Sequence, residues 1–367
     1  MKKDRIKKVV ILILIIVIFY FLFRQPKEEI KEPVITQPEP VQVAELQEET
    51  KKDFVEYLYI ADSFNNRIQV FRVDGNFSHY FGFRGTDYGM FRIPTDAQLY
   101  KGNIYVLDKG NSRIQVFNES GEFLYSIGDI GEGPKMKYPY DFDVVDDNIY
   151  VSDTYNNVIL VYDTSGDYIE TIGSKGRKPG QLMSPYGVAA NEDYIFILDT
   201  FNHRVSMFTR DGEFVRMWGN YSRQIGGLRF PYGIAVHNNS VYIADTFNHR
   251  IKEYDFEGRI LNSFGTFGKD DEQFRFSGKI WVANDLLYVA DINNHRIKAY
   301  HPNGTLALKF GKRGRGLGEF IFPGGKRYIP STIGNITRDL NITNETFPLP
   351  PYAPPLIPMG PAGTNSS

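Results

Sequence analysis

The chain contains no cysteine, so it has no disulfide framework, no thiol nucleophile and no cysteine-ligated zinc. This absence does not exclude export, because a chain of 367 residues can bury enough apolar surface to fold without cross-links. The formal net charge is only −2, so no overall field attracts nucleic acid. The sequence also offers no catalytic triad, carboxylate pair or phosphate-binding loop that can be placed from its motifs.

Near the N-terminus, residues 9–23 form an uncharged apolar run. A helix over them would span about 22 Å, short of a bilayer core of about 30 Å, but Tyr20 and the flanking basic residues can extend the span through the interface. Arg24-Gln25-Pro26 follows without a small-residue cleavage site, which favours a retained signal-anchor over the alternative, a cleaved signal peptide. The basic residues before the run predict a single-pass protein of the cell membrane, with residues 1–8 cytoplasmic and the remainder extracytoplasmic.

Two segments lack any strand or helix period. Residues 24–52 are rich in Glu, Gln, Pro and Lys, which predicts a flexible linker. Residues 331–367 are rich in Pro, Asn and Thr, which predicts an extended or disordered tail. The folded domain is therefore expected over residues 53–330.

N-glycosylation acceptors are more frequent than the roughly two that chance would give, which fits an extracellular protein. The alternative is that Asn, Ser and Thr simply concentrate in turns. The candidate sites are Asn76, Asn118, Asn220, Asn238, Asn303, Asn335, Asn341, Asn344 and Asn365.

Aromatic residues and glycine are abundant, and a repeat of 45–46 residues organises them. Each repeat has a segment that starts with Asp and resembles Asp62-Ser-Phe-Asn-Asn-Arg67. The first residues of these segments are Asp62, Asp108, Asp153, Asp199, Asp245 and Asp291. Proline or serine follows on the same spacing, at 94, 139, 185, 231, 277 and 323. Self-similarity at such a period indicates a propeller, solenoid or array.

Within one repeat the pattern predicts four short strands, a to d, with no segment of helical period. In the fifth repeat these are residues 233–236, 241–244, 250–254 and 259–264. The first repeat begins at strand b, and residues 324–329 after the last repeat look like an orphan strand a. We therefore predict an all-β six-bladed propeller, closed by pairing this C-terminal strand beside strand b of the first blade.

The segment Asp-Thr-Phe-Asn-His-Arg, at 199–204 and 245–250, resembles the signature of NHL-repeat propellers, and the resemblance covers residues 54–330. It implies the fold far more specifically than the activity. Relatives include protein-binding and RNA-binding modules, extracellular adhesion or sensor domains, and enzymes similar to lyases. Cytoplasmic relatives often carry a Cys-rich ubiquitin-ligase module, which this chain lacks.

Several motif residues have both a structural and a functional interpretation. The six Asp residues are expected to cap their loops rather than to form a metal ring. His203, His249 and His295 occupy identical places in three repeats; they are a weak candidate for a zinc site, since the family motif itself carries His there. The motif Arg is expected to pair with nearby carboxylates or carbonyls, with anion binding as the alternative. It is present in every repeat but the third, which has Val158.

The best candidate for a ligand-binding surface is specific to three blades. Tyr140, Tyr186 and Tyr232 follow the proline in repeats three to five, and we expect them to cluster at the channel mouth, flanked by Arg204 and Arg250. Core packing is the alternative role for the tyrosines. Four acceptors, Asn76, Asn118, Asn238 and Asn303, fall at turns of the opposite face; Asn220 falls on the same face as the tyrosines.

These observations favour a membrane-anchored extracytoplasmic binding module for a protein or glycan, used in adhesion, sensing or scaffolding. The alternative is an extracellular enzyme resembling propeller lyases, with a metal-assisted site in the channel. Strand a of repeats four and five, residues 187–190 and 233–236, is small and apolar, which disfavours the enzyme. No cofactor is expected, and RNA binding is disfavoured by the extracytoplasmic placement.

Overall fold

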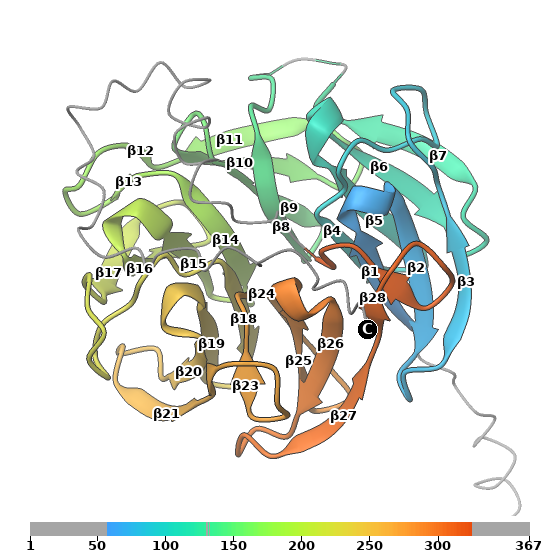
Figure 1. Cartoon of the computed structure of the whole chain (residues 1–367). Helices are drawn as coiled ribbons and strands as arrows, with labels where there is room; N and C mark the ends of the chain where they lie inside the picture. The colour runs from blue at the N-terminus through green and yellow to red at the C-terminus, as the bar shows by residue number, and fades with distance from the viewer. Residues whose placement is uncertain (1–56, 130, 132, 325–367) are drawn as a thin grey trace, which may run out of the picture. The chain divides into compact units, whose positions relative to one another are not determined.

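The computed structural model describes residues 57–129, 131 and 133–324, which form six antiparallel sheets around a common axis (Figure 1). Neighbouring strands in each sheet are consecutive in the chain, so every sheet is a meander. The first strand of each full sheet contacts its counterparts in adjacent sheets and lines the axis. The six-bladed propeller predicted from the repeat is confirmed.

The strand boundaries agree with the predicted ones to within one or two residues. Blade one contains β1 (Tyr57–Asp62), β2 (Arg67–Arg72) and β3 (Phe77–Phe81). Blade two contains β4 (Asp96–Tyr100), β5 (Asn103–Asp108), β6 (Arg113–Asn118) and β7 (Phe123–Ile127). Blade three contains β8 (Pro139–Val145), β9 (Asn148–Asp153), β10 (Val158–Asp163) and β11 (Tyr168–Ile172).

The other three blades repeat the same plan. Blade four contains β14 (Pro185–Ala190), β15 (Tyr194–Asp199), β16 (Arg204–Thr209) and β17 (Phe214–Trp218). Blade five contains β18 (Gly233–His237), β19 (Ser240–Asp245), β20 (Arg250–Tyr254) and β21 (Ile260–Phe264). Blade six contains β24 (Ser277–Ala283), β25 (Leu286–Asp291), β26 (Arg296–Tyr300) and β27 (Leu306–Phe310).

Two features of the loops are not predicted by the sequence. The loop between strands b and c contains one turn of 3-10 helix in every blade except the third; these turns are η1 (Ser63–Asn65), η2 (Lys109–Asn111), η3 (Thr200–Asn202), η4 (Thr246–Asn248) and η5 (Ile292–Asn294). Three of the connections from strand d to the next strand a contain a short parallel ladder. These ladders pair β12 (Ser174–Lys175) with β13 (Gln181–Leu182), β22 (Thr266–Phe267) with β23 (Gln273–Phe274), and β28 (Lys312–Arg313) with β29 (Glu319–Phe320).

Six clusters of the hydrophobic core lie between neighbouring blades, one for each pair. This follows from strand alternation, since a single sheet presents apolar side chains on both faces and must cover both. The cluster between blades six and one includes Phe71 and Phe320, whose ring centroids are 5.5 Å apart. The ring is therefore closed by apolar packing between the two ends of the repeat array.

Two backbone contacts at the same junction are the first of those predicted for closure of the ring. Pro323 forms a bridge with Asp62, and the Gly324 amide donates to the Ala61 carbonyl at 2.8 Å. The rest of the predicted closing strand, residues 325–329, lies outside the described residues, as do the predicted membrane anchor (9–23), linker (24–52) and tail (331–367). Within the part that the structure describes, no helix is long and apolar enough to cross a membrane.

Replacing Phe320 by alanine should test how much this junction contributes. Phe320 is fully buried, so Phe320→Ala should lower the free energy of unfolding by about 3–5 kcal/mol through lost burial and the cavity left behind. Urea unfolding monitored by tryptophan fluorescence measures the change. The control Leu261→Ala, at a side chain that is 55% exposed, should stay within about 0.5 kcal/mol of the parent protein. Equal effects would contradict the assigned role of the junction.

Candidate functional site

We name the two faces by their loops. The top face carries the loops between strands b and c and the connections from strand d to the next strand a. The bottom face carries the turns between strands a and b and between strands c and d. The residues of the repeat motif lie on the top face.

Each motif Asp fixes the connection that leads into its own blade. In blade two, Asp108 accepts hydrogen bonds from Asn111 Nδ2 at 2.7 Å, Arg113 Nε at 3.1 Å and the Arg92 amide at 2.7 Å. All six carboxylates are fully buried and accept a backbone amide of the incoming connection. Loop capping was the expected role, but in five blades the Asp side chain makes no cap bond to its own 3-10 turn.

Burial raises the pKa of four of these carboxyls, Asp62, Asp108, Asp153 and Asp199, although the surrounding donors oppose the shift. Each carboxylate lies within its own blade. Among the described residues, no group of three His, Asp or Glu side chains is placed to hold a metal ion. The hydrogen bonds of the six motif Asp residues therefore indicate a structural role.

The motif arginines extend the same contacts. Arg204 donates to Asp199 and to the carbonyls of Arg177 and Gln181 at 2.9 and 2.8 Å, and its Nη1 lies 2.9 Å from Met217 Sδ on the outer strand. Arg250 makes the corresponding bonds to Asp245 and the Gln224 carbonyl. We expected Arg204 and Arg250 to flank the tyrosine cluster. The structure corrects this, because both guanidinium groups point into the connections of their own blades.

Two of the three motif histidines bond to the next blade through a ring nitrogen, whereas Nδ1 of His249 is buried without a hydrogen-bond partner among the described residues. His203, His249 and His295 have left-handed backbone conformations, with φ of 56–57°. Nδ1 of His203 accepts from the Phe230 amide of the next blade at 3.2 Å, and Nδ1 of His295 accepts from the Phe322 amide at 3.4 Å. Asn66 and Asn157 occupy the same place in blades one and three and use Oδ1 in the same way. Both residue types supply an acceptor, and Asn also tolerates this backbone conformation well.

This geometry requires neutral imidazole. Burial lowers the pKa of His203 and of His249 to about 4, and neighbouring arginines add to the shift. The three residues lie in separate blades and each packs on its own aromatic ring, Phe230, Phe276 or Phe322. The arrangement gives them a structural role in place of a shared zinc site.

The three tyrosines cluster as the sequence predicts. The rings of Tyr140 and Tyr186 stack with centroids 4.4 Å apart, and Tyr186 lies 4.8 Å from Tyr232. Tyr140 and Tyr232 also contact each other although they belong to non-adjacent blades, so the cluster lies toward the axis. The side chains are only 4–7% exposed and pack with Phe230. Their burial favours the packing role that the sequence left open.

Below the tyrosines, a charged layer crosses the channel. Lys279 of β24 donates to Asp96 of β4 at 2.7 Å and to Asp141 of β8 on the opposite side of the ring. Burial alone would lower the pKa of Lys279, but the charges of Asp141 and Asp96 outweigh it and raise the pKa. Lys279 therefore stays protonated and links three blades across the axis.

The channel carboxylates also satisfy backbone groups of the next blade. Asp141 accepts from the Val188 amide at 3.1 Å, and Asp143 accepts from the Ala190 amide at 2.8 Å. Gln98 pairs with the amide and carbonyl of Val144 in the same way. An inner strand has one edge without a strand partner, and these side chains occupy it. Burial raises the pKa of Asp143.

Sequence reasoning missed this layer, because it examined strand a in blades four and five, where the corresponding residues are glycine and alanine. The signal was present in the other blades: Asp96, Asp141 and Lys279 lie two residues after the repeat proline or serine, at the place of Gly187 and Gly233. Aligning the inner strands of all blades would have revealed it.

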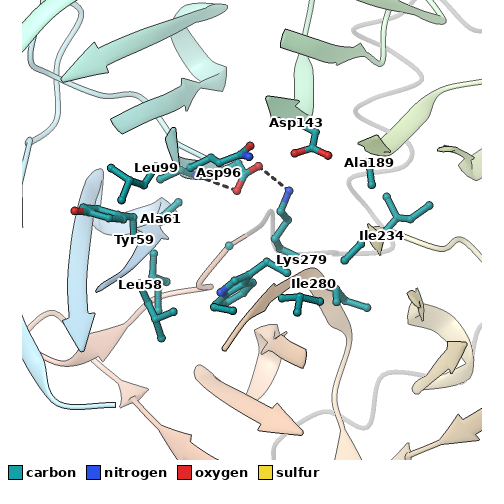
Figure 2. Close-up of a pocket in the computed structure, with 18 of the residues that line it drawn as sticks. Leu58, Tyr59, Ala61, Asp96, Leu99, Asp143, Ala189, Ile234, Lys279 and Ile280 are labelled. Carbon is teal, nitrogen blue, oxygen red and sulfur yellow. Dashed lines mark hydrogen bonds and ion pairs between the residues drawn. The ribbon is translucent and has the colours of Figure 1, made fainter. Parts of the chain in front are cut away.

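A cavity of about 370 Å³ lies beside this layer and extends along the channel (Figure 2). Leu58, Tyr59 and Ala61 of β1 face Lys279 and Asp143 across it. Its lining reaches His237 and Ala283, the last residues of β18 and β24, so it extends toward the bottom face. The charged layer, through Asp96 and Lys279, borders it toward the top.

Exposed apolar side chains are distributed unevenly over the propeller. Of the 17 large hydrophobic side chains that are exposed among the described residues, nine lie in top-face loops, six on outer strands and two at the bottom ends of β1 and β4. The top-face residues are Phe64, Phe83, Tyr88, Ile93, Tyr155, Tyr221, Ile225, Phe267 and Leu317. The outer-strand residues are Tyr80, Leu124, Ile169, Met217, Ile260 and Leu261, and the bottom residues are Tyr57 and Leu99.

The glycosylation acceptors occupy the expected turns. Asn76, Asn238 and Asn303 are exposed in bottom-face turns, and Asn220 is exposed in a top-face connection. Asn118 is half-buried at the end of β6 and donates to Glu122 at 2.7 Å. The acceptors at 335, 341, 344 and 365 lie outside the described residues.

Comparisons with known proteins agree on the fold. A family described as 6-bladed beta-propeller matches residues 86–135 and 135–218. No curated protein matches the sequence significantly. Among solved structures, virginiamycin B lyase from Staphylococcus aureus is 14% identical, with a TM-score of 0.50 over 70% of this chain and 81% of that chain.

Two further structures are similar. A chain of the nidogen/laminin complex is 14% identical, with a TM-score of 0.54 over 69% of this chain and 92% of its own. A protein of unknown function from Bacteroides caccae is 13% identical, with a TM-score of 0.53 over 70% of this chain and 93% of its own. The chain is thus a six-bladed β-propeller, and identities this low establish the fold alone.

Acid should destabilise the protein through His203 and His249. Their pKa values of about 4 in the folded state lie below the ordinary 6.5, so the unfolded chain binds more protons between these values. Stability should be complete above pH 6.5 and fall by roughly 1–3 kcal/mol per histidine as the pH drops to 4. Urea unfolding across this range measures it. His203→Asn with His249→Asn, which copies Asn66 and Asn157, should flatten the profile; an unchanged slope would refute the assignment.

Lys279→Met should leave Asp96 and Asp141 as uncompensated buried carboxyls. We expect a loss of about 3–5 kcal/mol in the free energy of unfolding at pH 7. The loss should shrink as the pH falls, because burial raises the pKa of Asp141 and its carboxyl then becomes neutral. Adding Asp96→Asn and Asp141→Asn should restore most of the stability. A cost below about 1 kcal/mol for Lys279→Met alone would show that the cross-channel link contributes little.

Proposed function

We propose that the protein is an NHL-type propeller that binds a protein partner through its top face and is displayed outside the cytoplasm by an N-terminal anchor. One observation carries the proposal: among the described residues, exposed large apolar side chains gather on the top-face loops, nine against two at the bottom ends. Apolar side chains scattered singly need no explanation, but their concentration on one face is typical of an interaction surface. Loops positioned by a rigid scaffold are also where propellers and sandwiches commonly bind.

The composition of this surface favours a protein over a glycan. Ile93, Ile225 and Leu317 contribute aliphatic area beside the aromatic residues. Aromatic rings can stack on sugars, but aliphatic side chains offer a glycan no hydrogen bonds, whereas protein interfaces use both kinds. The buried tyrosine cluster of Tyr140, Tyr186 and Tyr232 would form the rigid floor beneath such a contact.

The NHL assignment and the cellular placement have separate support. Asp-Thr-Phe-Asn-His-Arg occurs twice, and its Asp, Asn, His and Arg make the contacts described above. Display outside the cytoplasm is supported by the basic N-terminus, the apolar run at 9–23 and the acceptor sites. Four of the five acceptor sites within the propeller would place sugars on the bottom face. Sugars there would leave the top face free.

A lyase-like enzyme is the second candidate, since the channel holds Asp96, Asp141 and Asp143 beside a cavity. However, Lys279 sits between two of these carboxylates, and its charge would repel a metal ion. The similarity to virginiamycin B lyase extends to the fold alone. We therefore rank a metal-assisted channel enzyme below the binding module.

Site-specific cross-linking on intact cells tests the proposal. The full-length protein would carry a photoreactive amino acid in place of Phe267 on the top face or, as the control, Leu261 on outer strand β21; their side chains are 60% and 55% exposed. We expect a discrete protein adduct from position 267 alone, sensitive to protease added outside the cells. Ile225→Ser in the same background should reduce adduct yield more than tenfold.

Other outcomes count against specific parts of the proposal. Equal adducts from both positions would show no preference for the top face. An adduct that enzymatic deglycosylation of the cells abolishes would indicate a glycan partner. Protection of the adduct from external protease would contradict display outside the cytoplasm, and release of a soluble protein starting near residue 25 would show that the N-terminal segment is cleaved.

A further inference from the structure

The exposed charges of the propeller are divided between its two faces, although the formal net charge of the chain is only −2. Among the described residues, the top-face loops and connections carry twelve exposed basic residues and four exposed acidic ones, Asp87, Asp270, Asp271 and Glu272. The bottom-face turns of the same ranges carry twelve exposed acidic residues and two exposed basic ones, Lys101 and Arg259. The top face is therefore strongly positive and the bottom face strongly negative.

The positive charge of the top face is not neutralised within the described part of the propeller. Of the twelve exposed basic residues, only Lys312 has a described carboxylate within 4.0 Å, that of Glu319 at 3.2 Å. Both basic residues of the bottom-face turns, in contrast, are paired: Lys101 lies 2.8 Å from Asp147, and Arg259 also has carboxylate partners. The top-face cations are thus available to a negatively charged partner.

Basic and apolar side chains coincide most closely over blades one and two. The connections 311–322 and 82–95, which lead into these blades, hold five of the twelve basic residues. These connections and the b-to-c loop of blade one also hold five of the nine exposed apolar residues, which are 38–60% exposed. We call this set the basic–apolar surface. Its basic members are Arg84, Arg92, Lys312, Arg313 and Arg315. Its apolar members are Phe64, Phe83, Tyr88, Ile93 and Leu317.

Hydrogen bonds join the segments that present this surface. Asn65 Nδ2 in the b-to-c loop of blade one donates to the Gly314 carbonyl of the first connection at 3.1 Å. The Ile93 amide of the second connection donates to Asn66 Oδ1 of the same loop at 3.0 Å. The backbone beneath the surface is therefore fixed before any partner binds, which lowers the entropy cost of binding.

We propose that the partner of the top face contributes an acidic polypeptide segment that also carries apolar side chains, and that this segment docks on the basic–apolar surface. The inference rests on the proposed function, in which the top face binds a protein. Four of the five basic members are arginines, whose guanidinium groups bind carboxylates through two parallel hydrogen bonds. Arginine beside aromatic residues is also the usual composition of binding hot spots.

Two other occupants fit the surface less well. An anionic glycan or a nucleic acid would pair with the arginines but would leave the aliphatic Ile93 and Leu317 without a partner. A second copy of this chain would offer its acidic bottom face. Among the described residues, that face exposes only Tyr57 and Leu99 as large apolar side chains, and it carries four of the glycosylation acceptors. An acidic protein segment satisfies both the charges and the apolar side chains.

Model polymers test the chemistry of the surface in the full-length protein, held in a neutral detergent. Fluorescence anisotropy would compare a random copolymer of Glu and Tyr with poly-Glu of the same length and with heparin. We expect the copolymer to bind at least tenfold more tightly than either, and its affinity to fall at least fivefold between about 50 and about 300 mM salt. Heparin or poly-Glu that binds as tightly as the copolymer would overturn the proposal, since any polyanion would then suffice.

Charge reversal locates the binding site. Arg313→Glu with Arg315→Glu should weaken copolymer binding more than tenfold. The control, Lys101→Glu with Arg259→Glu, makes the same change in net charge on the bottom face and should stay within twofold of the parent protein. Equal losses from the two pairs would show that binding follows net charge and would overturn the site. Leu317→Ser, which alters no charge, should weaken binding of the copolymer but not of poly-Glu; an equal effect on both would contradict the apolar contact.

The photo-cross-linking experiment separates this inference from the proposed function. Position 267 lies in the connection into blade six, the neighbour of blade one, so Arg313→Glu with Arg315→Glu should reduce its adduct yield more than tenfold. An undiminished adduct would leave the top-face partner in place and overturn its acidic character. Absence of an adduct from the parent protein would instead contradict the proposed function. An adduct of twice the mass of the chain would identify a second copy and overturn the proposal.

Discussion

The buried carboxylate of the repeat motif is the interaction on which this propeller depends. In each blade it accepts from the b-to-c loop and from an amide of the incoming connection, so two loops meet on one charge. The motif Asn completes the site in each blade, together with the motif Arg in every blade except the third, where Val158 replaces it. A buried charge is tolerated only when it is this well bonded, which explains why the spacing of these residues changes so little from blade to blade.

The repeat made the blade count, strand order and strand limits predictable, because period and alternation are properties of local sequence. The side-chain contacts of the top face were less predictable. The side chains of Arg204 and Arg250 point into the connections because their partners, Asp199 and Asp245, are buried at these connections. The burial of these two carboxylates is visible only once the loops are packed. The sequence predicted that the tyrosines cluster. It did not predict their burial, because the exposure of a residue beside the channel mouth depends on packing by other blades.

The channel shows the limit of repeat reasoning most clearly. Lys279 is 183 residues from Asp96 and 138 residues from Asp141 in sequence, and no local pattern joins them. They break the repeat at a single inner-strand position, where other blades have glycine; at Gly233 an added Cβ would lie 1.9 Å from the Gly278 carbonyl oxygen. Gly233 of blade five is therefore packed against the backbone of blade six, whereas blades two, three and six are joined by charge.

The closure at Phe320, Pro323 and Gly324 has a consequence for biogenesis. Blade one is built from the first and last parts of the propeller sequence, so its sheet and the core between blades six and one form only after all six repeats have been synthesised. Until then β1 keeps an unpaired edge and one blade face exposes apolar side chains, both of which favour aggregation. Because β1 is synthesised first, it would have to wait longest for its partner. Quality control during synthesis would therefore act on blade one above all.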